Sequence, residues 1–238
     1  MEIGKKQRDP KKSLSRQVVD SIEEMIMERK LGPGDLLPTE IQISEELQVS
    51  KSSVREAIKM LEALGVVEIR RGLCTVISKN PEQGYMNVML SHFYLNSGNE
   101  EDLQNFRYII ESAYTTYAIH QATDNDLAAI REKLELFREK LRNGTLEAED
   151  DILFHGQILQ ATHNSFMISL GNALNELFRR SIAIAIRDNP EVALHDHESI
   201  YQAIVNRDPV AAEKVIAASA RQWAASFKIQ DAVAESTL

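Results

Sequence analysis

The chain has 238 residues, of which 43% are hydrophobic and 26% are charged, a composition typical of a folded protein with a sizeable core. No apolar run approaches the roughly 20 residues needed to cross a bilayer, and the basic, polar N-terminus lacks the apolar stretch of a signal peptide. A single cysteine, Cys74, excludes an internal disulfide framework and a cysteine-rich zinc module. We therefore expect a cytoplasmic protein with no membrane partner.

The net charge of −9 is unevenly distributed along the chain. Residues 1–79 contain 14 Lys and Arg against 13 Asp and Glu, whereas the remainder contains 13 against 23. This asymmetry predicts two modules with different partners. A near-neutral module can still bind DNA if its basic groups share one surface.

The first 79 residues predict an arm, three helices and a β-hairpin. Residues 1–13 are charged, and we expect them to form a flexible arm. A first helix follows the arm and ends at the helix-breaking stretch "LGPGDLLP". Thr39 and Gln42 have the spacing of a capping box that starts a second helix, and Ser50 is expected to cap a third helix over 51–64. The stretch "VVEIRRGLCTVI" then predicts two short strands. We assign residues 14–79 to one domain.

The third predicted helix carries a basic face opposite an apolar stripe. Lys51, Arg55 and Lys59 recur at four-residue spacing, and the hydroxyls of Ser50 and Ser52 lie at its N-terminus. Hydroxyls at a helix N-terminus contact phosphates, and arginine can read guanine in the major groove. The alternative is a solvated basic face on a small helical domain.

Beyond residue 79 the strand patterns disappear. Residues 80–99 read as a linker with a short helix, residues 100–228 as an all-α bundle of six or seven helices, and residues 229–238 as a frayed tail. The expected long helices span residues 100–122, 124–143, 146–162, 165–187, 191–206 and 208–228. Asp124 and Asp208 stand where helix N-caps are expected. The predicted fold is therefore mainly α, with a winged helix-turn-helix followed by a helical bundle.

The N-terminal blocks "PGDLLPTE", "VSKSSVREAI" and "LEALGVVEIRRG" are similar to the winged helix-turn-helix of the GntR family of bacterial transcription regulators. The resemblance implies double-stranded operator DNA as a partner. Ile41 and Cys74 depart from the family pattern, since a basic residue and a glycine often stand at these positions. The DNA contacts implied by the resemblance, together with the predicted N-cap, are Ser50, Lys51, Ser52, Arg55, Arg71 and Gly72.

Asp151 and His155 are four residues apart in the apolar stretch "DILFHGQIL", so a helix would place them on one face. Taken alone, the pair is either part of a metal or ligand site or a polar pair inside a helical core. The second half of the chain resembles the ligand-sensing FCD domain of the FadR branch of the same family. That resemblance implies that Asp151, His155 and His197 are metal ligands, while Ser219 stands where a fourth histidine is usual. Zn, Ni or Mn would suit such ligands.

The resemblance also implies an effector pocket in the helical domain. Arg107 matches an arginine that faces the family's cavity and could hold a carboxylate through two hydrogen bonds. The expected effector-binding residues are Arg107, Asn164, Arg180, Tyr201, Ser219 and Gln222. We therefore predict a non-enzymatic, homodimeric, ligand-responsive repressor that senses a small carboxylate or sugar acid. The alternatives are a metal-free pocket for a larger ligand, such as an acyl thioester, and a helical-bundle metalloenzyme.

Overall fold

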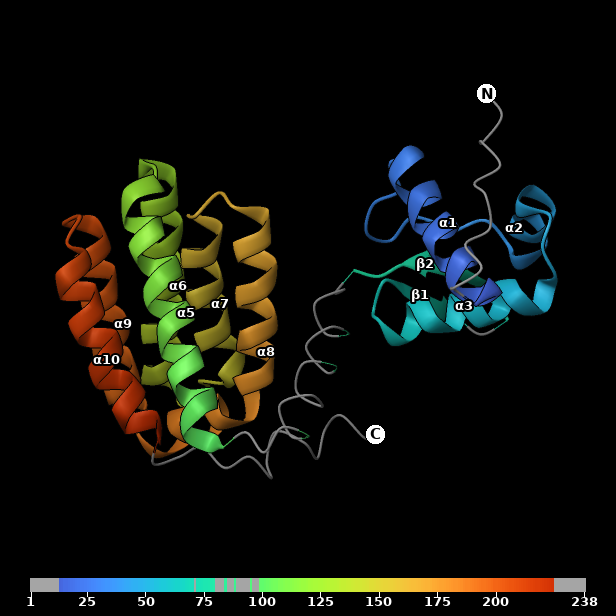
Figure 1. The fold of residues 1–238 in the computed structure, drawn as a ribbon. Helices are drawn as coiled ribbons and strands as arrows, with labels where there is room; N and C mark the ends of the chain where they lie inside the picture. The colour runs from blue at the N-terminus through green and yellow to red at the C-terminus, as the bar shows by residue number, and fades with distance from the viewer. Residues whose placement is uncertain are drawn as a thin grey trace. The chain divides into compact units, whose positions relative to one another are not determined.

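The computed structural model describes residues 13–70, 72–79, 84, 88, 95 and 99–224, and the chain divides into two compact units, residues 1–88 and 89–238 (Figure 1). The first unit is a winged helix-turn-helix and the second is a helical bundle, which confirms the predicted fold class. Among the described helices, none is both long and apolar enough to cross a bilayer.

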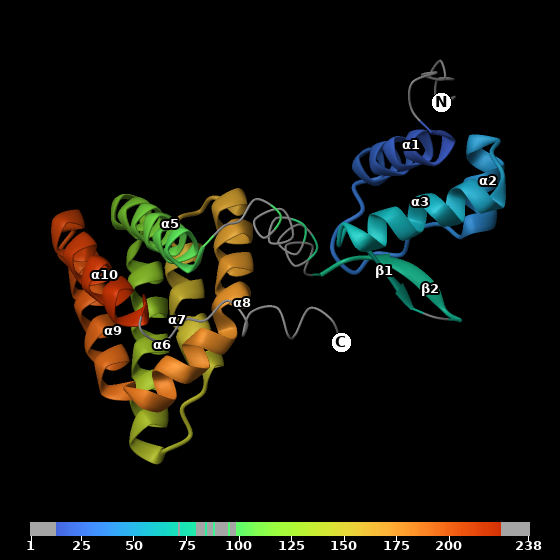
Figure 2. The same cartoon turned by 60° about the horizontal axis from the view of Figure 1, so that its bottom comes forward.

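The described part of the N-terminal unit contains three helices and a hairpin (Figure 2). Its elements are α1 (Leu14–Glu28), α2 (Glu40–Leu47), α3 (Lys51–Ala63), β1 (Val67–Arg70) and β2 (Cys74–Ile77). The two strands are antiparallel, with Val67 opposite Ile77 and Arg70 opposite Cys74. The hairpin therefore forms the wing that follows the helix-turn-helix.

Side-chain caps fix where these helices begin. Thr39 and Gln42 form a reciprocal capping box at α2, and the Ser50 side chain accepts a hydrogen bond from the backbone amide of Ser53 at α3, which confirms both predicted caps. Ser13, assigned to the arm from the sequence, instead caps α1 by accepting from the amide of Arg16 at 3.3 Å. The rest of the predicted arm lies outside the described residues.

One apolar core holds the N-terminal unit together. Its fully buried members come from all three helices and from the hairpin, and α3 contributes four of them. These four residues are Val54, Ala57, Ile58 and Leu61. Because α3 buries this stripe against α1 and α2, its opposite face is exposed.

The second unit consists of six described helices. They are α5 (Glu100–Gln121), α6 (Asp124–Asn143), α7 (Ala148–Gln160), α8 (Ser165–Asp188), α9 (Pro190–Val205) and α10 (Pro209–Ala224). Helix α7 packs against α5, α6 and α8, whereas α9 packs against α6 and α10 (Figure 1). Polar side chains on the inner faces of α5, α7 and α9 are therefore buried within the bundle.

Two predicted caps in this unit had different outcomes. Asp208 caps α10, since its Oδ1 accepts a hydrogen bond from the amide of Ala211 at 3.0 Å. The prediction for Asp124 was wrong, because Thr123 is the N-cap of α6 and forms a reciprocal capping box with Asp126. The predicted tail, 229–238, and almost all of the predicted linker, 80–99, lie outside the described residues.

Candidate functional site

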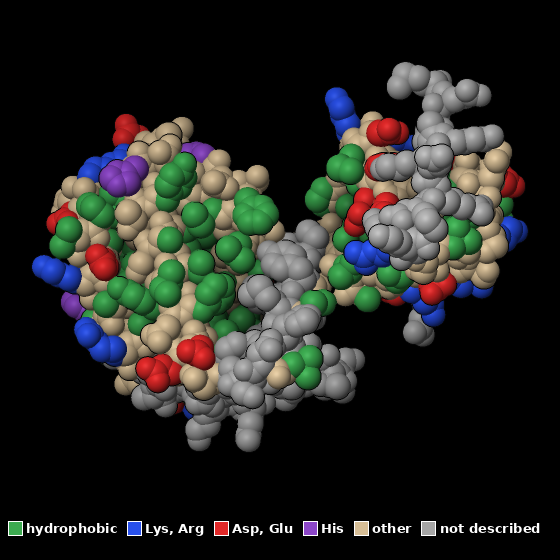
Figure 3. Space-filling model, in the orientation of Figure 1, with side chains coloured by type: hydrophobic (Ala, Val, Ile, Leu, Met, Phe, Trp, Pro, Cys, Tyr) green, Lys and Arg blue, Asp and Glu red, His purple; other side chains and the backbone are tan. Residues whose placement is uncertain are grey.

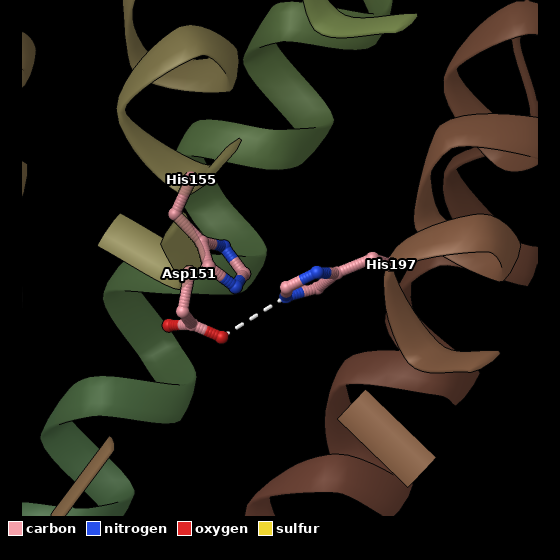
Figure 4. Close-up of side chains that lie close together, drawn as sticks. All are labelled: Asp151, His155 and His197. Carbon is pink, nitrogen blue, oxygen red and sulfur yellow. Dashed lines mark ion pairs between the residues drawn. The ribbon is translucent and has the colours of Figure 1, made fainter. Parts of the chain in front are cut away.

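The structure brings Asp151, His155 and His197 together inside the helical bundle (Figure 4). Asp151 and His155 lie one turn apart on α7, and His197 faces them from α9. One ligand atom from each residue lies within 4.8 Å of the other two. The three residues are only 2%, 5% and 2% exposed, so the cluster is shielded from solvent.

The contact between His197 and Asp151 leaves two polar atoms of the cluster without a hydrogen-bond partner in the described part of the chain. His197 Nε2 lies 3.1 Å from Asp151 Oδ1. Asp151 Oδ2 and His197 Nδ1 are buried without a hydrogen-bond partner among the described residues. Leaving buried polar atoms unsatisfied is costly, and one carboxylate with two imidazoles is a donor set that suits Zn, Ni or Mn. The residues therefore fit a divalent cation.

The protonation states also favour metal binding. Burial alone would raise the pKa of Asp151, but the hydrogen bond with His197 and the charges of His155, His197 and Arg107 outweigh burial and hold it at about 2. Burial lowers the pKa of His155, against the opposing attraction of Glu111 and Asp151. At neutral pH the site thus offers an ionised carboxylate and a neutral His155 imidazole, the forms that bind metals.

A second layer of side chains surrounds the two histidines. The Tyr114 hydroxyl lies 3.1 Å from His155 Nδ1, and Glu111 Oε1 lies 3.6 Å from the same nitrogen. The Phe154 ring stacks on His197 with centroids 4.2 Å apart, and Phe137 meets the same imidazole edge-on at 4.6 Å. Glu111 and Tyr114 were not among the residues predicted from the sequence, although their three-residue spacing places both on one face of α5.

A small cavity adjoins this layer through Glu111. It has a volume of about 20 Å³, enough for one water molecule. Its lining residues are Gln104, Arg107, Tyr108, Glu111, Phe178, Ser219 and Ala220. Arg107 and Ser219, both predicted from the sequence, thus face a common space.

Two side chains of opposite charge, Arg107 and Glu111, lie next to each other in this cavity. Arg107 Nε lies 3.7 Å from Glu111 Oε2, and the guanidinium lies over the Phe178 ring at 5.0 Å from its centroid. The Ser219 side chain forms a hydrogen bond with Asp196, a half-buried carboxyl whose pKa is raised by burial. Ser219 is therefore bound to a neighbouring carboxyl at the place where the family pattern has a histidine.

Three of the other predicted effector residues, Asn164, Arg180 and Tyr201, do not line this cavity. Asn164 is the N-cap of α8, where its side-chain oxygen accepts from the amides of Phe166 and Met167. Arg180 is exposed, and the Tyr201 hydroxyl accepts a hydrogen bond from Arg131 at 2.8 Å. The side chain of Gln222 lies outside the described residues.

The predicted DNA-reading residues lie on the exposed face of α3 and on the wing. Lys51, Ser52 and Arg55 are exposed, as is their N-cap Ser50. Gly72 is also exposed at the wing tip and has φ +74°, a left-handed conformation that favours glycine. Arg71 lies outside the described residues.

A salt bridge engages Arg55, the central cation of this face. Arg55 Nε donates to both carboxylate oxygens of Glu40, at 3.2 and 3.1 Å, and Nη2 donates to Oε2 at 2.8 Å; Glu40 lies in the first turn of α2. Hydrogen bonding to Glu40, together with its negative charge, raises the pKa of the guanidinium. This exposed pair links α3 to the start of α2. Ile41, where a basic residue is usual, is exposed on α2 beside it.

A winged helix-turn-helix followed by a helical domain with a buried ligand cluster defines a class of DNA-binding transcription regulators. Residues 14–77 match the family described as "Bacterial regulatory proteins, gntR family", and residues 102–221 match the FCD domain. The chain belongs to the GntR family and carries an FCD domain.

Similar proteins are regulators as well. The chain is 30% identical over 213 residues to the Uxu operon transcriptional regulator of Escherichia coli, covering 81% of this chain and 78% of that protein. It is 28% identical over 218 residues to the HTH-type transcriptional repressor NanR of Salmonella newport, covering 87% and 82%. The solved structure of Streptococcus agalactiae GntR is similar with a TM-score of 0.67 and 25% identity, over 89% of this chain and 99% of that one. The protein is therefore a transcription regulator and not an enzyme.

Proposed function

We propose that this regulator is a homodimeric repressor in the bacterial cytoplasm that responds to a small carboxylate or sugar acid. A divalent metal held by Asp151, His155 and His197 would supply a positive charge at the effector site. The effector would bind in the adjoining cavity, which would widen to admit it, and Arg107 could hold its carboxylate. Effector binding would shift the population between two arrangements of the DNA-binding units.

One observation carries this proposal: the Arg107 cavity adjoins the buried Asp151, His155 and His197 cluster through a shared residue, Glu111. A guanidinium pairs well with a carboxylate through parallel hydrogen bonds. A metal ion nearby would have coordination positions left for an effector oxygen or water, because the described cluster offers three ligands. Polar groups of this kind suit a small acid.

The volume of the cavity weighs against the alternative of a long acyl thioester. At about 20 Å³ the cavity would have to widen for either ligand, and an acyl chain would need by far the larger, apolar tunnel. Three polar or charged residues, Arg107, Glu111 and Ser219, also line the cavity. A small ligand that displaces water and reuses these hydrogen-bonding groups requires less rearrangement of the bundle.

On the DNA side, the exposed N-terminus of α3 would enter the major groove, with Arg55 reading a base and Ser50, Lys51 and Ser52 contacting phosphates. Gly72 and Arg71 would bring the wing close to the DNA backbone. Arg55→Ala should weaken binding to operator DNA by about 1–3 kcal/mol. Unchanged affinity in a fluorescence anisotropy titration would rule out this contact.

A homodimer is supported by an apolar stripe on α5. Ile109, Ala113 and Tyr117 recur at four-residue spacing, and all three are exposed. Figure 3 looks onto this side of the helical unit, where hydrophobic side chains gather. Exposed apolar patches mark protein–protein contacts, and a two-fold axis would match a palindromic operator. Ile109→Glu should therefore yield monomers in light-scattering chromatography, whereas the exposed control Glu132→Gln should leave the mass unchanged.

The metal and the effector can be tested in sequence. Metal content is measured by plasma mass spectrometry on protein purified without a histidine tag or chelator, alongside the His155→Ala variant. We expect near-stoichiometric Zn, Ni or Mn in the wild type and none in the variant. A thermal-shift screen of small carboxylates and sugar acids follows, with Arg107→Ala as the variant that should lose the stabilisation. A wild type that takes up none of the three metals after dialysis would refute the metal centre.

A further inference from the structure

The surroundings of His155 are strongly asymmetric. The hydrogen-bond and ion-pair partners described for its imidazole both lie on the Nδ1 side, where α5 presents the Tyr114 hydroxyl at 3.1 Å and Glu111 Oε1 at 3.6 Å. The other nitrogen, Nε2, is directed toward the space between Asp151 and His197 (Figure 4). The Nδ1 edge of the ring is thus oriented by α5, and the Nε2 edge is directed at the candidate metal position.

This asymmetry matters because a neutral imidazole carries its single proton on one nitrogen only. A metal can bind Nε2 only if the proton is on Nδ1, and a buried N–H then needs an acceptor. The Tyr114 hydroxyl oxygen is at hydrogen-bonding distance, and the Glu111 carboxylate adds negative charge on the same side. Metal-binding histidines are commonly held in this way by a carboxylate or another acceptor on the far nitrogen.

We infer that Tyr114 and Glu111 are positioning residues, which keep the proton of His155 on Nδ1 and leave Nε2 as the metal-binding atom. The inference rests on the proposed metal centre and assigns part of its affinity to α5, a helix that supplies none of the three ligands. The Tyr114 hydroxyl oxygen accepts a hydrogen bond from Nδ1–H, and the Glu111 charge stabilises this arrangement electrostatically. The imidazole is therefore preorganised before any metal arrives.

The first experiment measures zinc affinity by competition with a chromogenic chelator. Tyr114→Phe removes the acceptor and Glu111→Gln removes the charge, and each should weaken zinc binding about 10–100-fold. Glu101→Gln is the matched control, since it removes an exposed carboxylate from the same helix and should leave the affinity unchanged. If both positioning variants bind zinc within two-fold of the wild type, the inference is wrong.

The second experiment reads the proton position directly, in the metal-free protein. Two-bond ¹⁵N–¹H correlation spectra distinguish the two tautomers of a neutral histidine, and His155→Gln assigns the signal. We expect Nδ1–H in the wild type and a measurable population of Nε2–H in Tyr114→Phe, a change that a loss of packing alone would not produce. A wild-type protein with Nε2–H would overturn the inference.

The two experiments separate this inference from the proposed function. If the wild type takes up no metal but shows Nδ1–H, the proposed metal centre fails and the positioning by α5 stands. If it binds zinc with full affinity while His155 carries Nε2–H, the metal centre stands and the positioning fails. Glu111→Gln keeps the affinity test meaningful if Tyr114→Phe proves unstable, because Glu111 borders the cavity and is not packed in the apolar core.

Discussion

Asp151→Asn isolates the contribution of one buried charge to the stability of the helical unit. In the wild type, His197 Nε2 lies 3.1 Å from Asp151 Oδ1. The substitution keeps the shape of the side chain and leaves an oxygen that can still accept this hydrogen bond. It removes the negative charge and exchanges the second oxygen, Oδ2, for an amide NH2 group. The protein is studied with a chelator present, so that the measurement reports the metal-free fold.

The expected magnitude follows from the pKa of Asp151. This carboxyl titrates at about 2 in the folded protein instead of at its ordinary value of 3.8. Since one pH unit corresponds to about 1.4 kcal/mol, ionised Asp151 stabilises the fold by roughly 2 kcal/mol at neutral pH. The folded pKa is the lower one, so this stability is present above pH 3.8 and is lost as the pH falls toward 2. At pH 3 roughly half of it should remain.

The assay is urea denaturation followed by circular dichroism at pH 7 and at pH 3. Asp151→Asn should lower the free energy of unfolding by about 2 kcal/mol at pH 7 and by about half as much at pH 3. Glu149→Gln is the control on the same helix. The exposed Glu149 carboxylate pairs with Arg179 at 2.8 Å, and an exposed ion pair contributes about 0–1 kcal/mol to the free energy of unfolding. A loss of equal size at both pH values would show that packing, and not charge, stabilises this site.

Three further substitutions test other parts of the fold. Glu40→Gln should free Arg55 to contact phosphates. Anisotropy titrations on a duplex of arbitrary sequence should then show tighter binding, and the slope of log K against log salt concentration should be steeper by up to about one unit. Thr123→Ala removes the capping box of α6 and should lower the free energy of unfolding in urea by about 1 kcal/mol; an unchanged midpoint would contradict this. Gly171→Ala would place a methyl group 2.3 Å from Leu159 Cδ2, so it should cost about 1–3 kcal/mol in thermal unfolding, and a stabilised variant would show that α8 can shift.

Local patterns predicted the helix boundaries best where one side chain had a specific partner nearby in sequence. The Thr39–Gln42 capping box and the Ser50 cap depend on residues three positions away, so the sequence contains the whole interaction. At α6 two possible caps, Thr123 and Asp124, stand side by side. The structure selects the threonine because its third neighbour, Asp126, can complete the reciprocal bond.

The three candidate metal ligands could be predicted because two of them share a helix face and the third follows from the family resemblance. The second layer could not. Glu111 and Tyr114 contact His155 only because α5 packs against α7 with their face turned inward. The sequence around these two residues does not show which face of α5 turns inward. The same reason explains Arg180: it is exposed, whereas Phe178, two positions earlier on α8, is buried against the cavity.

Glu111 has one oxygen toward His155 and the other toward Arg107, so a single carboxylate borders both the proposed metal centre and the proposed effector cavity. A ligand that draws Arg107 away from Glu111 would alter the electrostatic support of His155. Coupling between two binding sites is reciprocal, so a metal that raises effector affinity ten-fold would itself be bound ten-fold more tightly when the effector is present. Such a regulator would integrate two inputs, and its threshold for the effector would move with the availability of the metal.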